Sequence, residues 1–147
     1  MYFVDRKKIE EHLQFMGDCL ETLENATFDE SKKDMYSLER IAHMLVESML
    51  DVGNSMIDGF IMRDPGSYED IIDILEDEKV VPADHADQLK KVIALRKPLV
   101  QAYTRIDHSH VHQTLTENLD AMKAFPQQVR TYLTEELGPV SAFLPEE

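Results

Sequence analysis

The chain has 147 residues, of which 43% are hydrophobic, enough for one domain with its own core, and we expect a single domain over residues 1–147. Its formal net charge of −14 argues against broad, non-specific binding to nucleic acid or to anionic membranes, since both are polyanions. No apolar run approaches the roughly 20 residues of a membrane-spanning helix. The N-terminus before Asp5 is too short for the apolar part of a signal peptide. A single cysteine, Cys19, excludes an internal disulfide, so a cytoplasmic location is expected.

Two long helices are predicted in the first 60 residues. The second should begin near Ser31, with Asp34 as a capping-box-like acid, and its apolar stripe runs from Leu38 to Phe60. Gly53 lies inside this stripe, where glycine costs about 1 kcal/mol relative to alanine. Close approach of another helix would explain it, and a local kink is the alternative. The first helix, from Asp5 to about Asn25, has apolar residues at alternating spacings of four and three: Ile9, Leu13, Met16, Leu20 and Leu23.

Turn and capping residues divide the middle of the chain. Arg63 to Gly66 forms a turn, and Ser67 is a good N-cap for a short helix from Tyr68 to about Glu78. Pro82 suits the first turn of a fourth helix, whose apolar face continues to Val100.

The last helix should start after Asp107, which is a plausible cap. Pro126 should kink it, because proline removes a backbone donor and clashes with the preceding turn. Gly138 should end it, leaving a loose tail from about residue 138. No segment alternates apolar and polar residues in the manner of a strand. The predicted fold class is therefore all-α, an antiparallel helical bundle of four long helices plus one short helix.

Side chains that can bind anions concentrate in one segment of this acidic protein. They favour an anion site there, while a solvated face that balances the many acids is the alternative. The segment also contains Gln101 and Tyr103 close to Pro98. Its five cations are Lys90, Lys91, Arg96, Lys97 and Arg105.

The geometry of this segment depends on Pro98. In an unbroken helix Arg96 and Tyr103 share a face, and Gln101 points roughly 140° away from Arg96. A break at Pro98 would turn Arg96 toward Gln101, because proline disfavours helical geometry at Lys97. Alternatively, two copies of the segment meet across a dimer axis and form a composite site. Both arrangements stay open, as does the plain alternative that Arg96 and Tyr103 are ordinary surface residues.

The spacing of Arg96, Gln101 and Tyr103, with Ile106-Asp107 following, resembles the motif of the HepT-like HEPN family. That motif is arginine, four residues, histidine, one residue and tyrosine. The resemblance extends over roughly residues 5–137 through further landmarks: Asp51 to Asn54, Pro65 to Tyr68, and Ile74-Leu75.

The resemblance implies a helical homodimer that is the ribonuclease-type toxin of a prokaryotic toxin–antitoxin pair. RNA would be its target, and no cofactor or metal is expected. It also implies a partner, a minimal nucleotidyltransferase antitoxin that can attach AMP to the motif tyrosine, here Tyr103. No membrane is implied.

Gln101 departs from the family pattern, which has histidine at this position. RNA cleavage requires removal of the 2′-hydroxyl proton, protonation of the leaving 5′-oxygen and compensation of the phosphate charge. Arg96 supplies only the last, through a bidentate fork. Histidine exchanges protons near neutral pH and glutamine does not. A general acid or base typically contributes about 10²–10⁴-fold, so we expect cleavage to be weak or absent unless another residue substitutes.

Three histidines just downstream are candidate substitutes: His108, His110 and His112. On a helix, His108 and His112 share a face, a spacing that also suits a metal, but no third ligand accompanies them. A polar helix start at the surface is the plain alternative. His12, His43 and His85 are isolated in the sequence and receive no role.

Two functions compete at this stage. The first is a HepT-like ribonuclease-type toxin with catalytic residues Arg96, Gln101 and Tyr103, and with anion- or RNA-binding residues Lys90, Lys91, Lys97 and Arg105. The second is a non-catalytic dimeric interaction module that binds a partner nucleotidyltransferase, nucleotide or RNA. Gln101 and the net charge favour the second, whereas the clustered cations favour the first. A purely structural bundle with an accidental motif is a third alternative.

Overall fold

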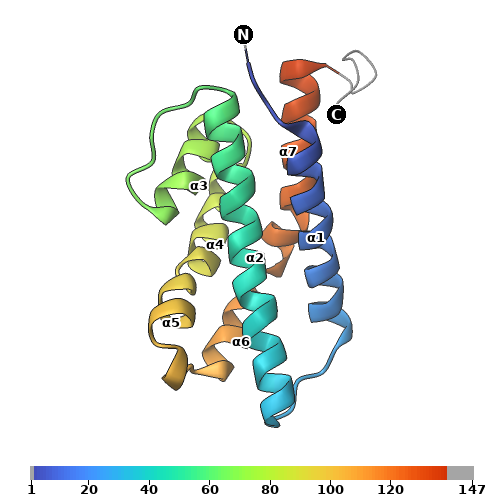
Figure 1. The fold of residues 1–147 in the computed structure, drawn as a ribbon, viewed down its shortest axis with the longest axis vertical. Helices are drawn as coiled ribbons and strands as arrows, with labels where there is room; N and C mark the ends of the chain where they lie inside the picture. Colours follow the sequence, from blue (N-terminus) through green and yellow to red (C-terminus); the bar gives the residue numbers. More distant parts are fainter. Residues whose placement is uncertain (1, 139–147) are drawn as a thin grey trace.

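The computed structural model describes residues 2–138, and every regular element in that range is helical, which confirms the all-α prediction (Figure 1). The predicted loose tail lies almost wholly outside the described residues. The elements are α1 (Arg6–Asn25), α2 (Lys32–Gly59), α3 (Tyr68–Asp77), α4 (Ala83–Ile93), α5 (Arg96–Gln101), a 3-10 turn η1 (Tyr103–Arg105), α6 (His108–Glu117) and α7 (Leu119–Leu137).

Short polar side chains fix where several helices begin. Ser31 accepts a hydrogen bond from the Asp34 backbone N–H, at the start of α2. Ser67 accepts the Asp70 N–H at the start of α3, and Asp107 accepts the His110 N–H at the start of α6. Each cap satisfies one backbone donor that has no partner inside its helix. The predicted starts at these three residues are confirmed.

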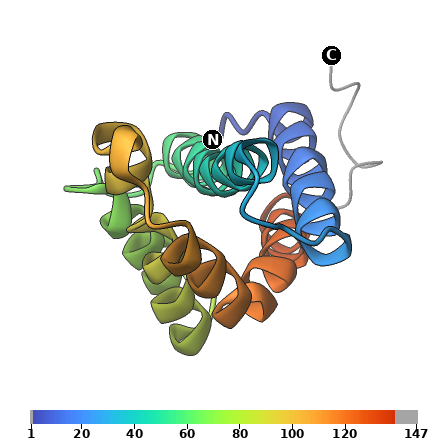
Figure 2. The ribbon, with the colours of Figure 1, turned by 90° about the horizontal axis from the view of Figure 1, so that it is seen from below.

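The long helix α2 is the centre of the bundle. It packs against α1 on one side and against α3, α5 and α6 on the other, and α7 lies beside α1 and α4 (Figure 2). The start of α1 and the end of α7 lie at the same end of the molecule (Figure 1), where the Arg6 guanidinium donates to the Gly138 carbonyl at 2.8 Å. The core between the helices contains fully buried large side chains, among them Leu45, Met49, Leu75, Leu89 and Phe125.

Gly53 marks a close approach of α3 to α2, as one of the two sequence interpretations proposed. A Cβ atom added at Gly53 would lie 2.4 Å from Cγ2 of Ile71, which is closer than two carbon atoms can pack. Glycine at this position therefore lets α3 lie directly on α2, and this contact fixes the position of α3.

The predicted fourth helix is broken, and the break precedes Pro98. Helix α4 ends at Ile93, and Leu95, whose N–H donates to the Val92 carbonyl at 3.0 Å, tightens the turn before α5 begins at Arg96. Pro98 consequently occupies the first turn of α5, where a missing N–H leaves no hydrogen bond unmade. Pro98 is thus the physical reason for the helix break, as predicted, but the break lies one turn before the predicted position.

The predicted last helix is also divided, at Asn118 and not at Pro126. The buried Asn118 side chain donates to the Thr114 carbonyl at 2.8 Å, and its own N–H donates to the same oxygen, so α6 ends there. Helix α7 then continues through the buried Pro126 to Leu137. Gly138 ends it with a φ of 85°, a value that suits glycine, as predicted.

Cys19 is half-buried and packs against the core. Burial raises the pKa of its thiol, which disfavours the reactive thiolate. Among residues 2–138, no helix combines the length and the apolar character needed to cross a bilayer.

Candidate functional site

The motif arginine lies where three helices meet. Arg96 opens α5, and its Nε donates to Oε1 of Glu47 on α2 at 2.7 Å. Its guanidinium carbon lies 4.3 Å from the ring centre of Tyr68, the first residue of α3. The hydrogen bond to Glu47 raises the pKa of Arg96 above its ordinary value, so the side chain stays charged at every pH of interest. The position of the guanidinium is therefore set by a carboxylate at one nitrogen and an aromatic ring at its face.

Arg96 and Gln101 line one small depression in a single copy of the chain. Its volume is about 190 Å³, and Lys97 also lines it. Tyr68 and Glu69 close it from the start of α3, and Ile93 and Ala94 from the end of α4. Because α5 starts at Arg96, its first and last residues, Arg96 and Gln101, line the same depression. The sequence had left this arrangement open as an alternative to a composite site between two copies.

Tyr103 follows this depression without lining it. The residue begins the turn η1 directly after α5, and 66% of its surface is exposed to solvent. An exposed phenol is the condition that transfer of AMP to this residue would require.

The five cations of the segment do not form one positively charged cleft. Lys90 pairs with Asp73 on α3 at 2.8 Å, and this contact raises the pKa of the lysine. Arg96 is paired with Glu47, and Glu69 lines the same depression. The remaining cations, Lys91, Lys97 and Arg105, are exposed. Their predicted contacts to RNA stay a prediction.

Two of the three downstream histidines, His108 and His112, line one hollow of about 490 Å³. Nε2 of His108 lies 2.6 Å from Oε2 of Glu39 on α2. The ring of His112 packs edge-on to Phe28 with ring centres 5.9 Å apart, and His110 is exposed. Within residues 2–138, no three potential ligands of the histidine, cysteine or carboxylate kind come together around a common point.

Sequence reasoning missed the residues that hold Arg96 in place. Glu47 precedes Arg96 by 49 positions, and Tyr68 belongs to a different helix. Only one signal was available for this group: His43 and Glu47 are spaced i, i+4 on the predicted second helix, which places them on one face. In the structure, Nε2 of His43 lies 3.5 Å from Oε1 of Glu47, a contact that was not predicted from the sequence.

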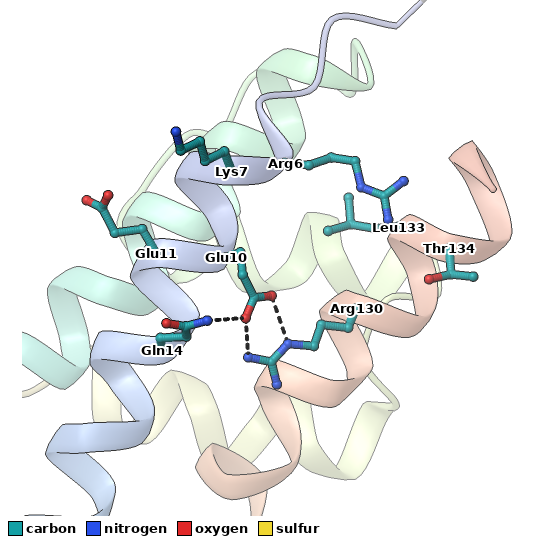
Figure 3. A pocket seen from close by; sticks show the side chains of 8 residues that line it. All are labelled: Arg6, Lys7, Glu10, Glu11, Gln14, Arg130, Leu133 and Thr134. Atoms are coloured by element: carbon teal, nitrogen blue, oxygen red, sulfur yellow. Dashed lines mark hydrogen bonds and ion pairs between the residues drawn. The ribbon is translucent and has the colours of Figure 1, made fainter. Parts of the chain in front are cut away.

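A larger cavity, of about 620 Å³, lies between α1 and α7, on the opposite side of α2 from α5 (Figures 1 and 3). Arg130 forms a bidentate pair with Glu10 there, at 2.9 and 2.8 Å, and Gln14 donates to the same carboxylate (Figure 3). The pair lowers the pKa of Glu10 and raises that of Arg130. These charges satisfy one another and tie α1 to α7, so we assign this cavity no chemistry.

An all-helical bundle that presents the motif arginine and tyrosine around a short broken helix is an architecture of the HEPN class. The family model described as "Ribonuclease HepT-like" matches residues 9–129, and the chain belongs to this family. Over 143 residues it is 52% identical to "Putative RNase YutE" of Bacillus subtilis (strain 168), a match that covers 97% of this chain and 99% of the relative.

Solved structures agree on the fold. The structure of Bacillus subtilis YutE, called a cytosolic protein of unknown function, superposes with a TM-score of 0.92 at 51% identity, over 97% of this chain and 100% of that one. The tri-AMPylated HEPN toxin of Shewanella oneidensis, in complex with its MNT antitoxin, gives a TM-score of 0.73 at 17% identity, over 84% of this chain and 96% of the toxin. The second likeness establishes the fold alone.

Proposed function

We propose that this protein is a HepT-like ribonuclease-type toxin that cleaves RNA without a metal and is controlled by a nucleotidyltransferase partner through Tyr103. The observation that carries the proposal is that Arg96 and Gln101 line one depression while the phenol of Tyr103 is exposed beside it. The name of the relative from Bacillus subtilis, "Putative RNase YutE", supports the activity. The AMPylated HEPN toxin in complex with its antitoxin supports the mode of control.

In this proposal Arg96 binds the scissile phosphate. Because its Nε is committed to Glu47, the two terminal nitrogens are directed to the substrate as a fork for two phosphate oxygens. The ribose 2′-oxygen attacks phosphorus, the bond to the 5′-oxygen breaks, and Arg96 compensates the charge that develops on the phosphate. Gln101 can donate a hydrogen bond to the phosphate or the ribose, but it cannot transfer a proton at neutral pH.

Control by the partner uses the exposed tyrosine. The Tyr103 oxygen attacks the α-phosphorus of ATP held by a minimal nucleotidyltransferase, pyrophosphate leaves, and the phenol proton passes to a base of that enzyme. AMP on Tyr103 then adds charge and bulk beside the depression, which blocks the approach of RNA.

A homodimer is part of the proposal. Large apolar side chains remain exposed on α1, α2 and α5, namely Phe15, Tyr36 and Val100, and they suit contact with a second copy that covers part of α2. Light scattering at micromolar concentration should give the mass of two chains. A monomer would contradict the dimer.

A second function, a non-catalytic dimeric module, is favoured by two observations. Gln101 occupies the position of the motif histidine, and both Lys90 and Arg96 are already paired with carboxylates. Such a module would bind the nucleotidyltransferase, nucleotide or RNA ends without cleaving them.

Two measurements separate these functions. Purified wild-type protein and Arg96→Ala are incubated with single-stranded RNA, and cleavage that depends on Arg96 supports the toxin. Binding without cleavage supports the module. We expect the neighbouring gene to encode a minimal nucleotidyltransferase. After incubation of the protein with that enzyme and ATP, mass spectrometry of the Tyr103 peptide should find added AMP that is absent from Tyr103→Phe.

A further inference from the structure

His43 lies on α2 within reach of the group that binds phosphate in the proposed function. Its Nε2 is 3.5 Å from Oε1 of Glu47, and the same oxygen accepts the Arg96 Nε hydrogen bond at 2.7 Å. A nitrogen–oxygen distance of 3.5 Å is an ion-pair contact and too long for a good hydrogen bond. The imidazole of His43 and the guanidinium of Arg96 therefore both contact the same carboxylate oxygen.

The ring of His43 is available for chemistry. About 35% of its side chain is exposed, and neither ring nitrogen has a hydrogen-bond partner among residues 2–138. Three of the other five histidines differ in this respect, whereas the rings of His110 and His112 likewise have no hydrogen-bond partner among residues 2–138. His108 is engaged by Glu39, His12 by the Lys8 carbonyl and His85 by Gln128, and none of these three contacts a residue that holds Arg96.

We propose that His43 is the proton-transfer residue of this site and takes the place of the histidine that the family motif has where this chain has Gln101. The proposal rests on RNA cleavage at Arg96. The imidazole would approach the scissile bond from α2, whereas the motif position lies on α5. The same chemistry would thus be supplied from a different helix.

The step balances with residues already described. The neutral His43 ring takes the proton from the ribose 2′-hydroxyl as the bond from O2′ to phosphorus forms and the bond from phosphorus to O5′ breaks. The leaving 5′-oxygen takes a proton from water, and the imidazolium returns its proton to the hydroxide. Glu47 stabilises the imidazolium while it exists, because its carboxylate lies 3.5 Å away. The products are a 2′,3′-cyclic phosphate and a 5′-hydroxyl.

The test measures kcat and KM on a single-stranded RNA oligonucleotide for wild type, His43→Asn and His43→Gln. We expect both variants to lower kcat by about 10²-fold or more, as loss of a general base does, with KM little changed. His12→Asn is the matched control, because its Nε2 lies 3.6 Å from a carboxylate, Asp51, that contacts no arginine. It should keep full activity. Circular dichroism checks that each variant is folded.

A second arm moves histidine back to the motif position. The double variant His43→Asn with Gln101→His should regain cleavage that His43→Asn alone lacks, and the products should again end in a cyclic phosphate. His43 variants that cleave as fast as wild type would overturn the proposal and leave the proposed function intact.

Gln101→His in the wild-type background distinguishes the two claims further. Cleavage by Gln101→His that depends on Arg96, with none by wild type, would overturn the role of His43 while the site itself stands. Absence of Arg96-dependent cleavage in both proteins would overturn the proposed function and the role of His43 together.

Discussion

Two arginines on either side of α3 use their guanidinium groups differently. Arg63 donates from both terminal nitrogens to the two carboxylate oxygens of Asp70, at 2.7 and 2.9 Å, and also lies 3.5 Å from Asp77. Arg96 donates to Glu47 through Nε alone and stacks on Tyr68. Both terminal nitrogens of Arg63 donate to a carboxylate, whereas Arg96 donates a side-chain hydrogen bond only through Nε among residues 2–138.

This difference matches the two roles that we propose, a structural one for Arg63 and phosphate binding for Arg96. The fork of Arg63 ties the turn before α3 to the first turn of that helix, and Asp70 completes the turn by accepting the Gly66 N–H at 2.8 Å. For Arg96, the anchors at Nε and at the ring face fix the guanidinium before any ligand arrives. An anion then binds with little loss of side-chain entropy.

The largest expected effect comes from removing each guanidinium in turn. Arg96→Ala should lower Arg96-dependent RNA cleavage by about 10²–10³-fold, the usual cost of removing a group that stabilises developing charge. Its melting temperature should also fall modestly, because the hydrogen bond to Glu47 is lost with the guanidinium. Arg63→Ala should likewise lower the melting temperature, but its kcat should be unchanged. Equal loss of activity in both variants would contradict the distinction.

The next largest effect is on stability and concerns the contact between α2 and α3. Helix α3 contains Tyr68, which contacts Arg96, and Asp70, which pairs with Arg63. Gly53→Ala places a methyl group against Ile71, and overpacking of this kind costs about 1–3 kcal/mol. Urea unfolding measures the free energy. The matched control is Gly17→Ala on α1, where nothing lies within 4 Å of the added atom, so the protein should be unchanged or gain up to about 1 kcal/mol. Equal stability of the two variants would show that α3 can move away from α2.

Local patterns in the sequence predicted the features that local chemistry decides. The stripe of α1 is buried at all five predicted positions, because a period of three and four residues is a property of one helix. The capping serines were recognisable for the same reason, since a cap needs only a residue three positions on. A close helix approach at Gly53 could be proposed because glycine destabilises a helix interior, so its presence there suggests a packing reason.

Features that depend on contacts between distant segments could not be predicted in this way. The pairing of Arg96 with Glu47, and its stacking on Tyr68, are set by how α2, α3 and α5 pack, and periodicity has no information on that. The same holds for helix breaks. Pro126 is the stronger local signal, yet the chain divides at Asn118, whose side chain is buried and bonds back to α6.

A smaller effect should follow from removing the ring beneath Arg96. Tyr68→Ala loses a cation–π contact of about 0.5–1 kcal/mol at an exposed site and frees the guanidinium to move. Tyr68→Phe keeps the ring and is the control. We expect kcat to fall several-fold in the alanine variant and to stay near the wild-type value in the phenylalanine variant. The affinity for RNA should likewise be lower for Tyr68→Ala and unchanged for Tyr68→Phe. Equal values for both would mean that Glu47 alone positions Arg96.

The smallest expected effect, and the most specific, is the pH dependence of the Arg63 pair. The hydrogen bond from Arg63 and then the Gly66 N–H lower the pKa of Asp70 from 3.8 to about 2. The folded state therefore holds its Asp70 proton less tightly than the unfolded state does. The pair's contribution is fully present above pH 4 and is lost as the pH falls toward 2.

Melting temperatures of wild type and Asp70→Asn at pH 7, 4 and 2 test this sign. Wild type should be the more stable at pH 7, by a modest margin since the pair is largely exposed to solvent. The margin should shrink between pH 4 and 2, because protonated aspartic acid no longer carries the charge that the guanidinium binds. Asp64→Asn, an exposed neighbour on the same turn, should leave a constant difference from wild type. A difference in melting temperature between wild type and Asp70→Asn that persists at pH 2 would mean that packing, and not charge, holds the turn. The ion pair of Arg63 would then not explain how this arginine differs from Arg96.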